Sequence, residues 1–356
     1  MSQKALIVRE LGAPLILGDR LIPRPGPNQL LVKVLVAGLN PHDQRTRDAG
    51  LFVTTYPYVL ASDLVGEVIA IGEGEHSTRF IVGDHVFGHT FVNEGDASDF
   101  GALQQYALAD ARFVAKVSDT GLTDDEASTI PVIVLAGFIA LFSKSGLNLP
   151  PPFSPDASSF DFPSATILVI GGGSNTGKAT IEIAKLAGFG RIIAVAGSQN
   201  KDQLEARGAT HVIDRHATNA LEQVRAIVGD DLVYAVDTVN TGHNQHFGIA
   251  ALSNSKRGTL ITLRRPEGDF GPDRIGIKTA GYERRLVLGV SPGHPEVTIG
   301  FWKELPAWLK GGKIRPSNYT VVQGLDPVAV NKALDDYLVR NVVKTNTHPW
   351  EEVCQQ

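Results

Sequence analysis

The sequence predicts an α/β fold in which a doubly wound parallel sheet is inserted into a β-rich domain. Strand and helix patterns alternate from Ala165 onward, which is typical of parallel sheets. Short apolar strands separated by Pro, Gly and Asp precede this region, and short strands return after Gly293. With 356 residues, the chain also exceeds the length at which a single core usually keeps growing. We therefore expect a first domain at 1–130, a parallel-sheet domain at 131–292 and a return to the first domain at 293–356.

The first domain is expected to be barrel-like. Its strand candidates are Leu30–Val36, Val65–Ile71 and Arg112–Val117. A helical stretch, Thr123–Ser145, follows, in which Thr123 can cap the helix and Glu126 has the capping-box spacing. The next segment, Asn148–Ser164, is dense in Pro, Ser and Asp without periodicity, which predicts an irregular surface loop.

The alternating region is read as a series of strands and helices. The expected strands are Ile167–Ile170, Ile192–Ala196, His211–Ile213, Leu232–Val236 and Thr259–Leu263. The expected helices between them are Gly177–Ala187, Lys201–Arg207 and Asn219–Val228. Two more helices, Thr298–Gly311 and Pro327–Val339, are expected in the C-terminal return.

Composition and charge exclude several classes of protein. Hydrophobic residues make up 43% and charged residues 20% of the chain, which is typical of a globular enzyme. The net charge is -5 with the two signs well mixed, so we expect neither nucleic acid nor a membrane as partner. The single cysteine, Cys354, excludes an intrachain disulfide framework. With no leader and no apolar run long enough to span a bilayer, we expect a soluble cytoplasmic protein.

A glycine-rich turn carries the sharpest signal in the sequence. The strand Ile167–Ile170 runs into this turn, and a helix follows at once. Backbone N–H groups at such a helix start can approach a pyrophosphate, which the helix dipole favours. The alternative is a tight turn without a ligand, which the surrounding βαβ pattern makes the weaker interpretation. The predicted cofactor contacts in this Rossmann fingerprint are Gly172, Gly173, Ser174, Asn175, Thr176 and Gly177, with Ser174 in place of the middle glycine.

The residues after the second strand indicate which nicotinamide cofactor binds. An enzyme that uses NAD places an acidic residue there, whereas this chain has Ser198 and Lys201. A hydroxyl and an ammonium suit a 2′-phosphate, and Arg215 after the third strand would close the pocket. The alternative is that both basic residues are solvated surface charges. We predict NADPH as the cofactor, with Val239 and Leu263 as further contacts.

The order of motifs resembles the medium-chain dehydrogenase/reductase superfamily over nearly the whole chain. The motifs are Val34–Asp43, Pro57–Val68, Val82–Gly88, Gly101–Ala107 and the nucleotide fingerprint. The Leu39-Asn-Pro-His-Asp43 element and the Pro-rich insertion look most like fungal zinc-independent members, among them quinone-reductase-like proteins and trans-acting enoyl reductases. The resemblance implies a discontinuous GroES-like barrel domain beside a Rossmann domain, with the substrate between them.

The departures from this family concern zinc. Zinc alcohol dehydrogenases have a cysteine near position 40 and Gly-His-Glu near position 62, where this chain has Asn40 and Ala61-Ser-Asp63. We therefore expect no metal site. His42, His85 and His89 could form a cluster, but their spacing favours ordinary polar or buried histidines.

Without zinc, hydride transfer to a conjugated C=C bond suits the scaffold better than alcohol oxidation. The resemblance implies that Asn40 holds the nicotinamide, although Asn before Pro41 is also a common turn residue. Asp63 matches a position that supports this region in relatives, or it fixes a loop by a hydrogen bond. Quinone-reductase relatives often have a tyrosine where this chain has Phe52. Tyr56 and Tyr58 are nearby candidate substitutes, and the alternative for them is strand packing beside Pro57.

The sequence therefore predicts an NADPH-dependent, zinc-independent reductase of an activated C=C bond, on a small-molecule or carrier-bound substrate of specialised metabolism. Two alternatives stay open, namely quinone reduction and non-catalytic NADPH binding. The oligomeric state is a monomer or a homodimer. By analogy with relatives, Gly281–Val290 is the edge strand through which a dimer would form.

Overall fold

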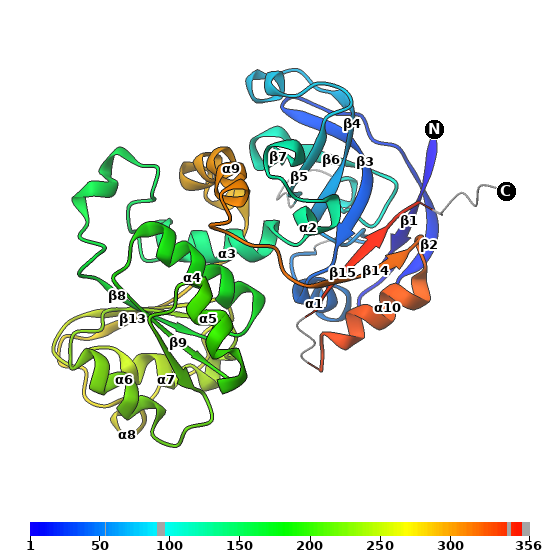
Figure 1. The fold of residues 1–356 in the computed structure, drawn as a ribbon. Helices are drawn as coiled ribbons and strands as arrows, with labels where there is room; N and C mark the ends of the chain where they lie inside the picture. The colour runs from blue at the N-terminus through cyan, green and yellow to red at the C-terminus, as the bar shows by residue number, and fades with distance from the viewer. Residues whose placement is uncertain (54, 91–96, 340–342, 351–356) are drawn as a thin grey trace. The chain divides into compact units, whose positions relative to one another are not determined.

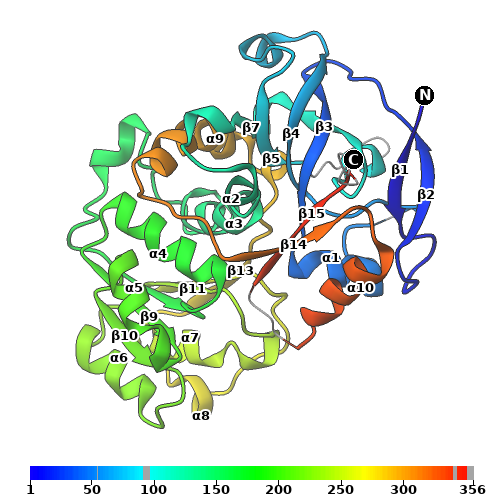
Figure 2. The ribbon, with the colours of Figure 1, turned by 45° about the vertical axis from the view of Figure 1, so that its right-hand side comes forward.

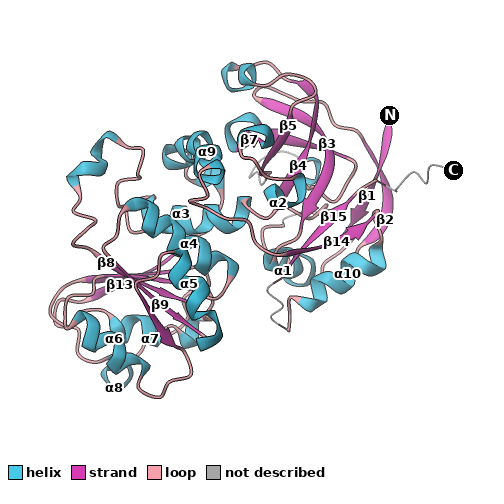
Figure 3. Cartoon of the chain, in the orientation of Figure 1, coloured by secondary structure: helices cyan, strands magenta, loops and turns pink. Residues whose placement is uncertain are grey.

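The computed structural model describes residues 1–53, 55–90, 97–339 and 343–350. It divides into two compact units (Figure 1). The flanking unit comprises Met1–Val132 together with the chain from Val290 onward, and the inserted unit comprises Ile133–Gly289. The sequence analysis predicts the corresponding domain limits 1–130, 131–292 and 293–356. Figure 3 shows that strands dominate the flanking unit, while strands and helices alternate in the inserted one.

The inserted unit contains a six-stranded sheet in which every described pair of neighbouring strands is parallel. The strand order is β10-β9-β8-β11-β12-β13, so the first strand of the unit lies inside the sheet and the order reverses between β8 and β11. This is the order of a Rossmann sheet, in which ligands bind beyond the carboxyl ends of the strands. The strands are β8 (Thr166–Ile170), β9 (Arg191–Ala196), β10 (His211–Asp214), β11 (Tyr234–Asp237), β12 (Gly258–Thr262) and β13 (Tyr282–Leu286).

Helices cover both faces of this sheet, which is why its central strands are apolar throughout. Helices α4 and α5 lie on one face, and α6, α7 and α8 lie on the other (Figure 1). Leu168, Ile193 and Leu260 are fully buried in the core that forms beneath these helices. The helices are α4 (Asn175–Ala187), α5 (Lys201–Arg207), α6 (Ala220–Val228), α7 (His246–Ala251) and α8 (Pro272–Ile275).

The flanking unit contains a seven-stranded sheet and a separate antiparallel pair, β1 with β2. The sheet follows the order β14-β15-β3-β4-β5-β7, and β6 also pairs with β3. Asn346 of β15 pairs with Gly38 of β3, so the C-terminal strands complete the sheet that the N-terminal part begins (Figure 2). The strands are β1 (Ser2–Ile7), β2 (Ile16–Leu21), β3 (Gln29–Gly38), β4 (Asp63–Ile71), β5 (His85–His89), β6 (Tyr106–Asp110), β7 (Val114–Lys116), β14 (Tyr319–Gln323) and β15 (Lys344–His348).

The predicted helical stretch Thr123–Ser145 is confirmed. It consists of two helices, α2 (Asp124–Ser128) and α3 (Pro131–Phe142). Pro131 disfavours helical geometry in the residue before it and lacks the N–H that a continuous helix needs. The predicted cap is confirmed, because Thr123 Oγ1 accepts from the Glu126 amide at 3.2 Å and the Glu126 carboxylate accepts from the Thr123 amide at 3.0 Å.

The predicted strand Arg112–Val117 is wrong in its first half. Asp110 Oδ1 accepts from the Arg112 amide at 2.9 Å, and this local bond turns Ala111–Phe113 into a 3-10 helix before β7 begins. The loop predicted at Asn148–Ser164 is irregular apart from a 3-10 turn at Pro155–Ser159.

Helices α9 (Pro295–Lys310) and α10 (Pro327–Asp336) agree with the predicted Thr298–Gly311 and Pro327–Val339 to within a few residues at their ends. Helix α1 (Pro41–Ala49), like α7 and α8, was not predicted. The segment Gly281–Val290 contains β13, which is the last strand at one end of its sheet, as predicted. In the described part of the chain, no helix has the length and apolar character needed to cross a bilayer.

Candidate functional site

The glycine-rich turn connects β8 to α4 at the carboxyl edge of the parallel sheet. Gly171 has φ +78°, in the left-handed region that favours glycine. Ser174 caps α4, and its hydroxyl accepts from the Gly177 amide at 2.9 Å. The same hydroxyl lies 3.1 Å from Thr238 Oγ1, which follows β11. The side chain at the middle-glycine position therefore closes the helix end and ties the turn to the neighbouring strand.

Gly177 permits the close approach of the helix to the turn. A Cβ atom there would lie 2.2 Å from the Gly171 carbonyl oxygen, which no side chain tolerates. This is the role of the last glycine in a Rossmann fingerprint, and it keeps the start of α4 against the end of β8.

The predicted 2′-phosphate residues lie at the same edge of the sheet. β9 and β10 are parallel neighbours with Ala196 opposite Asp214, so the segments that follow them leave the sheet side by side. Ser198, Lys201 and Arg215 are all exposed there. Lys201 Nζ is 3.9 Å from Glu205 in a pair whose side chains are 60% and 45% exposed, so its charge is weakly engaged.

The other predicted cofactor contacts also lie beyond the carboxyl ends of strands. A Cβ atom on Gly171 would lie 2.6 Å from a Val239 methyl group, which places Val239 beside the turn. The Leu263 amide donates to the Asp237 carbonyl oxygen at 3.1 Å, directly after β12. A Cβ atom on Gly173 would lie 3.0 Å from the Asn200 side chain, so the segment that contains Ser198 also adjoins the turn. The donor chemistry and exposure of this edge fit a phosphorylated dinucleotide.

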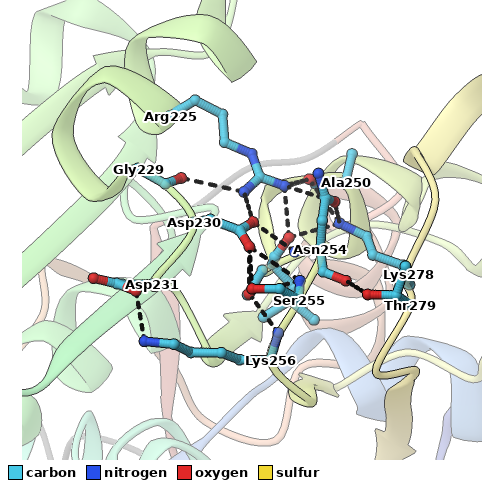
Figure 4. A network of polar contacts seen from close by, with 12 residues as sticks. Arg225, Gly229, Asp230, Asp231, Ala250, Asn254, Ser255, Lys256, Lys278 and Thr279 are labelled. Atoms are coloured by element: carbon cyan, nitrogen blue, oxygen red, sulfur yellow. Dashed lines mark hydrogen bonds and ion pairs between the residues drawn. The ribbon is translucent and has the colours of Figure 1, made fainter.

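The opposite, amino edge of the sheet holds a dense polar network (Figure 4). Asp230 accepts hydrogen bonds from the Asn254 amide at 2.6 Å and the Ser255 hydroxyl at 2.6 Å, among others, and these lower the pKa of its carboxyl group well below the usual range. Arg225 and Lys278 both donate to the carbonyl oxygens of Ala250 and Leu252 at the end of α7. Burial, with Arg225 nearby, lowers the pKa of Lys278 to about 8.

A pocket of about 350 Å³, including space open to solvent, lies within the flanking unit. His42, from the first turn of α1, and Ser62, just before β4, both line it, with His42 Nε2 3.1 Å from Ser62 Oγ. Asp43 Oδ1 lies 3.6 Å from the same nitrogen. The lining residues are His42, Asp43, Thr46, Phe52, Tyr58, Val59, Leu60, Ala61, Ser62, Thr90, Ala97, Phe100 and Gly101.

Asn40 and Asp63, both predicted as catalytic, belong to a buried network with Lys344. Their side chains are hydrogen-bonded to each other at 2.9 Å, and the Lys344 ammonium donates to Asn40 Oδ1 at 3.0 Å and forms an ion pair with Asp63. The other Asp63 oxygen accepts from the Val132 amide at 2.9 Å, at the start of α3. Asn40 is 2% exposed and Asp63 is fully buried. The network ties α1, β4, α3 and β15 together, which matches the loop-fixing alternative for Asp63.

Tyr56, the third predicted catalytic residue, packs against the hydrophobic core of the flanking unit. Its hydroxyl is buried and makes no hydrogen bond to the described residues. The Tyr56 hydroxyl lies 3.5 Å from the position of a Cβ atom on Gly50, at the end of α1. The side chain thus lies against the core of the flanking unit, and its catalytic role stays a prediction.

The three histidines considered as a cluster are engaged separately. His42 contacts Ser62, and exposed His85 lies 3.4 Å from Asp124. His89 is buried, and burial lowers its pKa to about 4, so its ring is neutral at ordinary pH. Among the residues that the structure describes, no three His, Cys, Asp or Glu side chains gather in a way that could hold a metal ion. Cys354 lies outside those residues.

Comparison with known proteins agrees with both units. Residues 26–119 match the alcohol dehydrogenase GroES-like domain, and residues 176–304 match the family described as zinc-binding dehydrogenase. The chain is 31% identical over 274 residues to the trans-enoyl reductase tndF of Aspergillus flavipes, which covers 75% of this chain and 72% of the relative. The chain belongs to the medium-chain dehydrogenase/reductase superfamily.

Solved structures of this superfamily share the fold. An alcohol dehydrogenase superfamily protein from Novosphingobium aromaticivorans superposes with a TM-score of 0.76 at 25% identity, over 97% of this chain and 99% of the other. A mycobacterial protein complexed with NADPH superposes with a TM-score of 0.72 at 23% identity, over 98% of this chain and all of the other. Within the superfamily the present chain is an enoyl-reductase-like oxidoreductase.

Sequence reasoning missed Lys344 and Ser62. Lys344 lies in a polar strand at the C-terminal end of the chain, 281 residues from Asp63, and nothing in its local pattern marks it as buried. Ser62 is the centre of Ala61-Ser-Asp63, where zinc-dependent relatives have a ligand. Sequence favours an ordinary polar or buried histidine at position 42, and nothing in the local pattern pairs it with Ser62, 20 residues away.

Proposed function

We propose that this protein reduces an activated, α,β-unsaturated C=C bond with NADPH as the hydride donor. The observation that carries the proposal is the carboxyl edge of the parallel sheet, where the Gly171–Gly177 turn adjoins exposed Ser198, Lys201 and Arg215. The trans-enoyl reductase relative supports the choice of reaction. The substrate would be a small molecule or a carrier-bound acyl chain, as the name of that relative suggests.

The turn and the start of α4 would hold the pyrophosphate, because a helix N-terminus presents backbone donors and a positive dipole end. Lys201, Ser198 and Arg215 would hold the 2′-phosphate through charge-assisted hydrogen bonds. Val239 and Leu263 would provide apolar contacts. When bound there, NADPH would supply a hydride equivalent.

The protein would not need zinc for this reaction. Asn40 is bonded to Asp63 and Lys344, and Asp63 is bonded to the Val132 amide, so two of the side chains at the positions of the family's zinc site belong to a structural network. A conjugated carbonyl needs only hydrogen bonds to stabilise the charge that develops on its oxygen. We expect activity to survive treatment with a metal chelator.

The test is a purified-protein assay that follows NADPH oxidation at about 340 nm across a panel of enones, unsaturated thioesters and quinones, with product analysis by mass spectrometry. Saturation of the C=C bond supports the proposal. Turnover of quinones alone, yielding hydroquinone or semiquinone, would instead establish quinone reduction. Tight NADPH binding with no turnover on any acceptor would establish a binding protein, and an absence of NADPH binding would refute the cofactor assignment.

A further inference from the structure

The hydroxyl of Thr238 is the centre of a hydrogen-bonded chain at the glycine-rich turn. Thr238 directly follows β11, whose last residue, Asp237, is paired with Ile170 at the end of β8. The Thr238 hydroxyl donates to the carbonyl oxygens of Ile170 at 3.0 Å and Gly171 at 3.2 Å, and it lies 3.1 Å from Ser174 Oγ. Thr238 is only 9% exposed. One buried hydroxyl therefore contacts the last residue of the strand and two residues of the turn.

The direction of this chain follows from the hydrogen atoms available. A hydroxyl group has one hydrogen to donate, and the two carbonyl oxygens share that of Thr238. Thr238 Oγ1 therefore accepts from the Ser174 hydroxyl, whose own oxygen accepts from the Gly177 amide at 2.9 Å. The bonds run from Gly177 through Ser174 and Thr238 to the end of β8, and such chains strengthen their members. Ser174 then has no hydroxyl hydrogen left for a phosphate oxygen.

Gly171 makes this chain possible. A Cβ atom added there would lie 2.7 Å from Thr238 Oγ1 and 2.6 Å from a methyl carbon of Val239. A side chain at Gly171 would therefore push the Thr238 hydroxyl away from the turn. Val239 is also held from its other side, because its amide donates to Asp237 Oδ1 at 3.1 Å. The turn and the segment after β11 are thus fixed against each other where the strand order of the sheet reverses.

We propose that Thr238 is a positioning residue for the dinucleotide, which keeps the backbone amides of the turn directed at the pyrophosphate. This inference rests on the proposed function. The middle glycine of the fingerprint lets the backbone approach the pyrophosphate, so the side chain of Ser174 at that position has to be held aside, and its bond to Thr238 does this. A turn that is already ordered loses less conformational freedom on binding. Thr238 would act on every ligand with a pyrophosphate, whereas Ser198 and Lys201 would act on the 2′-phosphate alone.

The test compares the binding of three ligands by wild type and Thr238→Val, measured by calorimetric titration. NADPH and NADH carry the pyrophosphate, whereas 2′-AMP carries only the 2′-phosphate. Thr238→Val keeps the shape of the side chain and removes its hydroxyl. We expect the Kd values for NADPH and NADH to rise about tenfold each, with the Kd for 2′-AMP unchanged. Thr238→Ser restores the hydroxyl and should bind all three ligands as wild type does.

Thr210→Val is the matched control at the opposite edge of the same sheet. Thr210 Oγ1 accepts from the Ile192 amide at 2.9 Å and donates to the Ile192 carbonyl oxygen at 3.0 Å, so it also joins two neighbouring segments. All three Kd values should stay unchanged in this variant. Ser174→Ala and the double variant with Thr238→Val complete a cycle. Because the two hydroxyls are bonded to each other, the double variant should weaken dinucleotide binding less than the product of the two single effects.

The outcomes separate this inference from the proposed function. Circular dichroism and Tm show whether Thr238→Val folds, and Ser174→Ala takes its place if it does not. If wild type binds NADPH and the variant binds both dinucleotides equally well, the positioning role is overturned and the proposed function stands. If the variant weakens 2′-AMP by the same factor, the hydroxyl supports the unit as a whole and the positioning role is again overturned. If wild type binds no dinucleotide, the cofactor assignment and this inference both fail.

Discussion

Charged side chains lie at both edges of the parallel sheet in the inserted unit, but the two edges differ in how these side chains are bonded. At the amino edge, Arg225 and Lys278 share the carbonyl oxygens that end α7, and Asp230 accepts several backbone and hydroxyl donors (Figure 4). At the carboxyl edge, Lys201 and Arg215 are exposed, Lys201 lies 3.9 Å from Glu205, and Arg215 donates to its neighbour His216.

The engaged charged groups at the amino edge stabilise the fold, whereas the exposed ones at the carboxyl edge are available to bind a ligand. A cation whose donors are used by carbonyl oxygens of its own chain stabilises those loops and gains little from a phosphate. A cation that stays solvated beside a helix N-terminus loses less when a phosphate replaces its water. Replacing a charged residue at the carboxyl edge should therefore weaken cofactor binding, whereas replacing one at the amino edge should leave cofactor affinity unchanged.

The largest effect is expected at the carboxyl edge from Gly177→Ala. Its Cβ atom would lie 2.2 Å from a backbone oxygen, which cannot yield as the end of a side chain can. We expect a loss of about 2–3 kcal/mol in the free energy of unfolding, measured by denaturant titration, together with weakened NADPH binding. Gly293→Ala is the control, because an added Cβ there meets no atom within 4 Å. If Gly177→Ala were as stable as wild type, the turn would not approach the helix as closely as this distance implies.

The second-largest effect is expected from the double variant Ser198→Ala/Lys201→Ala, which should lose its preference for NADPH over NADH. Charge-assisted hydrogen bonds contribute about 1.5–3 kcal/mol each, so the Kd for NADPH should rise at least about tenfold. The Kd for NADH should change little, because NADH has no 2′-phosphate. Calorimetric titration with both cofactors measures this. An equal loss for both would refute the phosphate pocket.

The carboxyl edge could be predicted from sequence because its signals are local. The strand, the turn and the capping Ser174 are consecutive, and Lys201 follows the next strand at a fixed spacing. The first half of the predicted strand Arg112–Val117 was wrong for a local reason as well. The Asp110 side chain bonds to the Arg112 amide, so that a 3-10 turn forms where a strand was expected. That competition depends on geometry that an apolar pattern does not encode.

The surroundings of the candidate catalytic residues could not be predicted in the same way, because they are built from distant segments. Asp63 meets Lys344 across 281 residues, and this contact makes Asn40 and Asp63 members of a buried network. A polar strand such as Lys344–His348 gives no sign that its first residue is 2% exposed. The sequence points to this region of the flanking unit, and only the structure shows which polar groups there line the pocket.

At the amino edge, Asp230→Asn should lower stability and leave the Kd for NADPH unchanged. Hydrogen bonds from Asn254 and Ser255 hold the pKa of Asp230 below its value in the unfolded chain, so the ionised carboxyl stabilises the fold. That contribution is fully present above about pH 4, the unfolded pKa, and is lost as the pH falls further. Because the side chain is 41% exposed, we expect only about 1–2 kcal/mol at pH 7. Denaturant titrations at pH 7 and at low pH measure it. A stability difference that persisted unchanged in acid would contradict the role of the charge.

The smallest effect is expected from Lys256→Ala, which removes the same charge as Lys201→Ala but from the amino edge. Lys256 pairs with Asp231 at 2.6 Å, and the two side chains are 58% and 75% exposed, so water and salt screen the attraction. The pKa of Lys256 is raised by its bond to Asp231, so the charge removed is a full one at pH 7. We expect both the Tm and the Kd for NADPH to stay within experimental error, while Lys201→Ala alone weakens NADPH binding. If Lys256→Ala weakened NADPH binding as much as Lys201→Ala, net charge rather than position would govern affinity, and the distinction between the two edges would not hold.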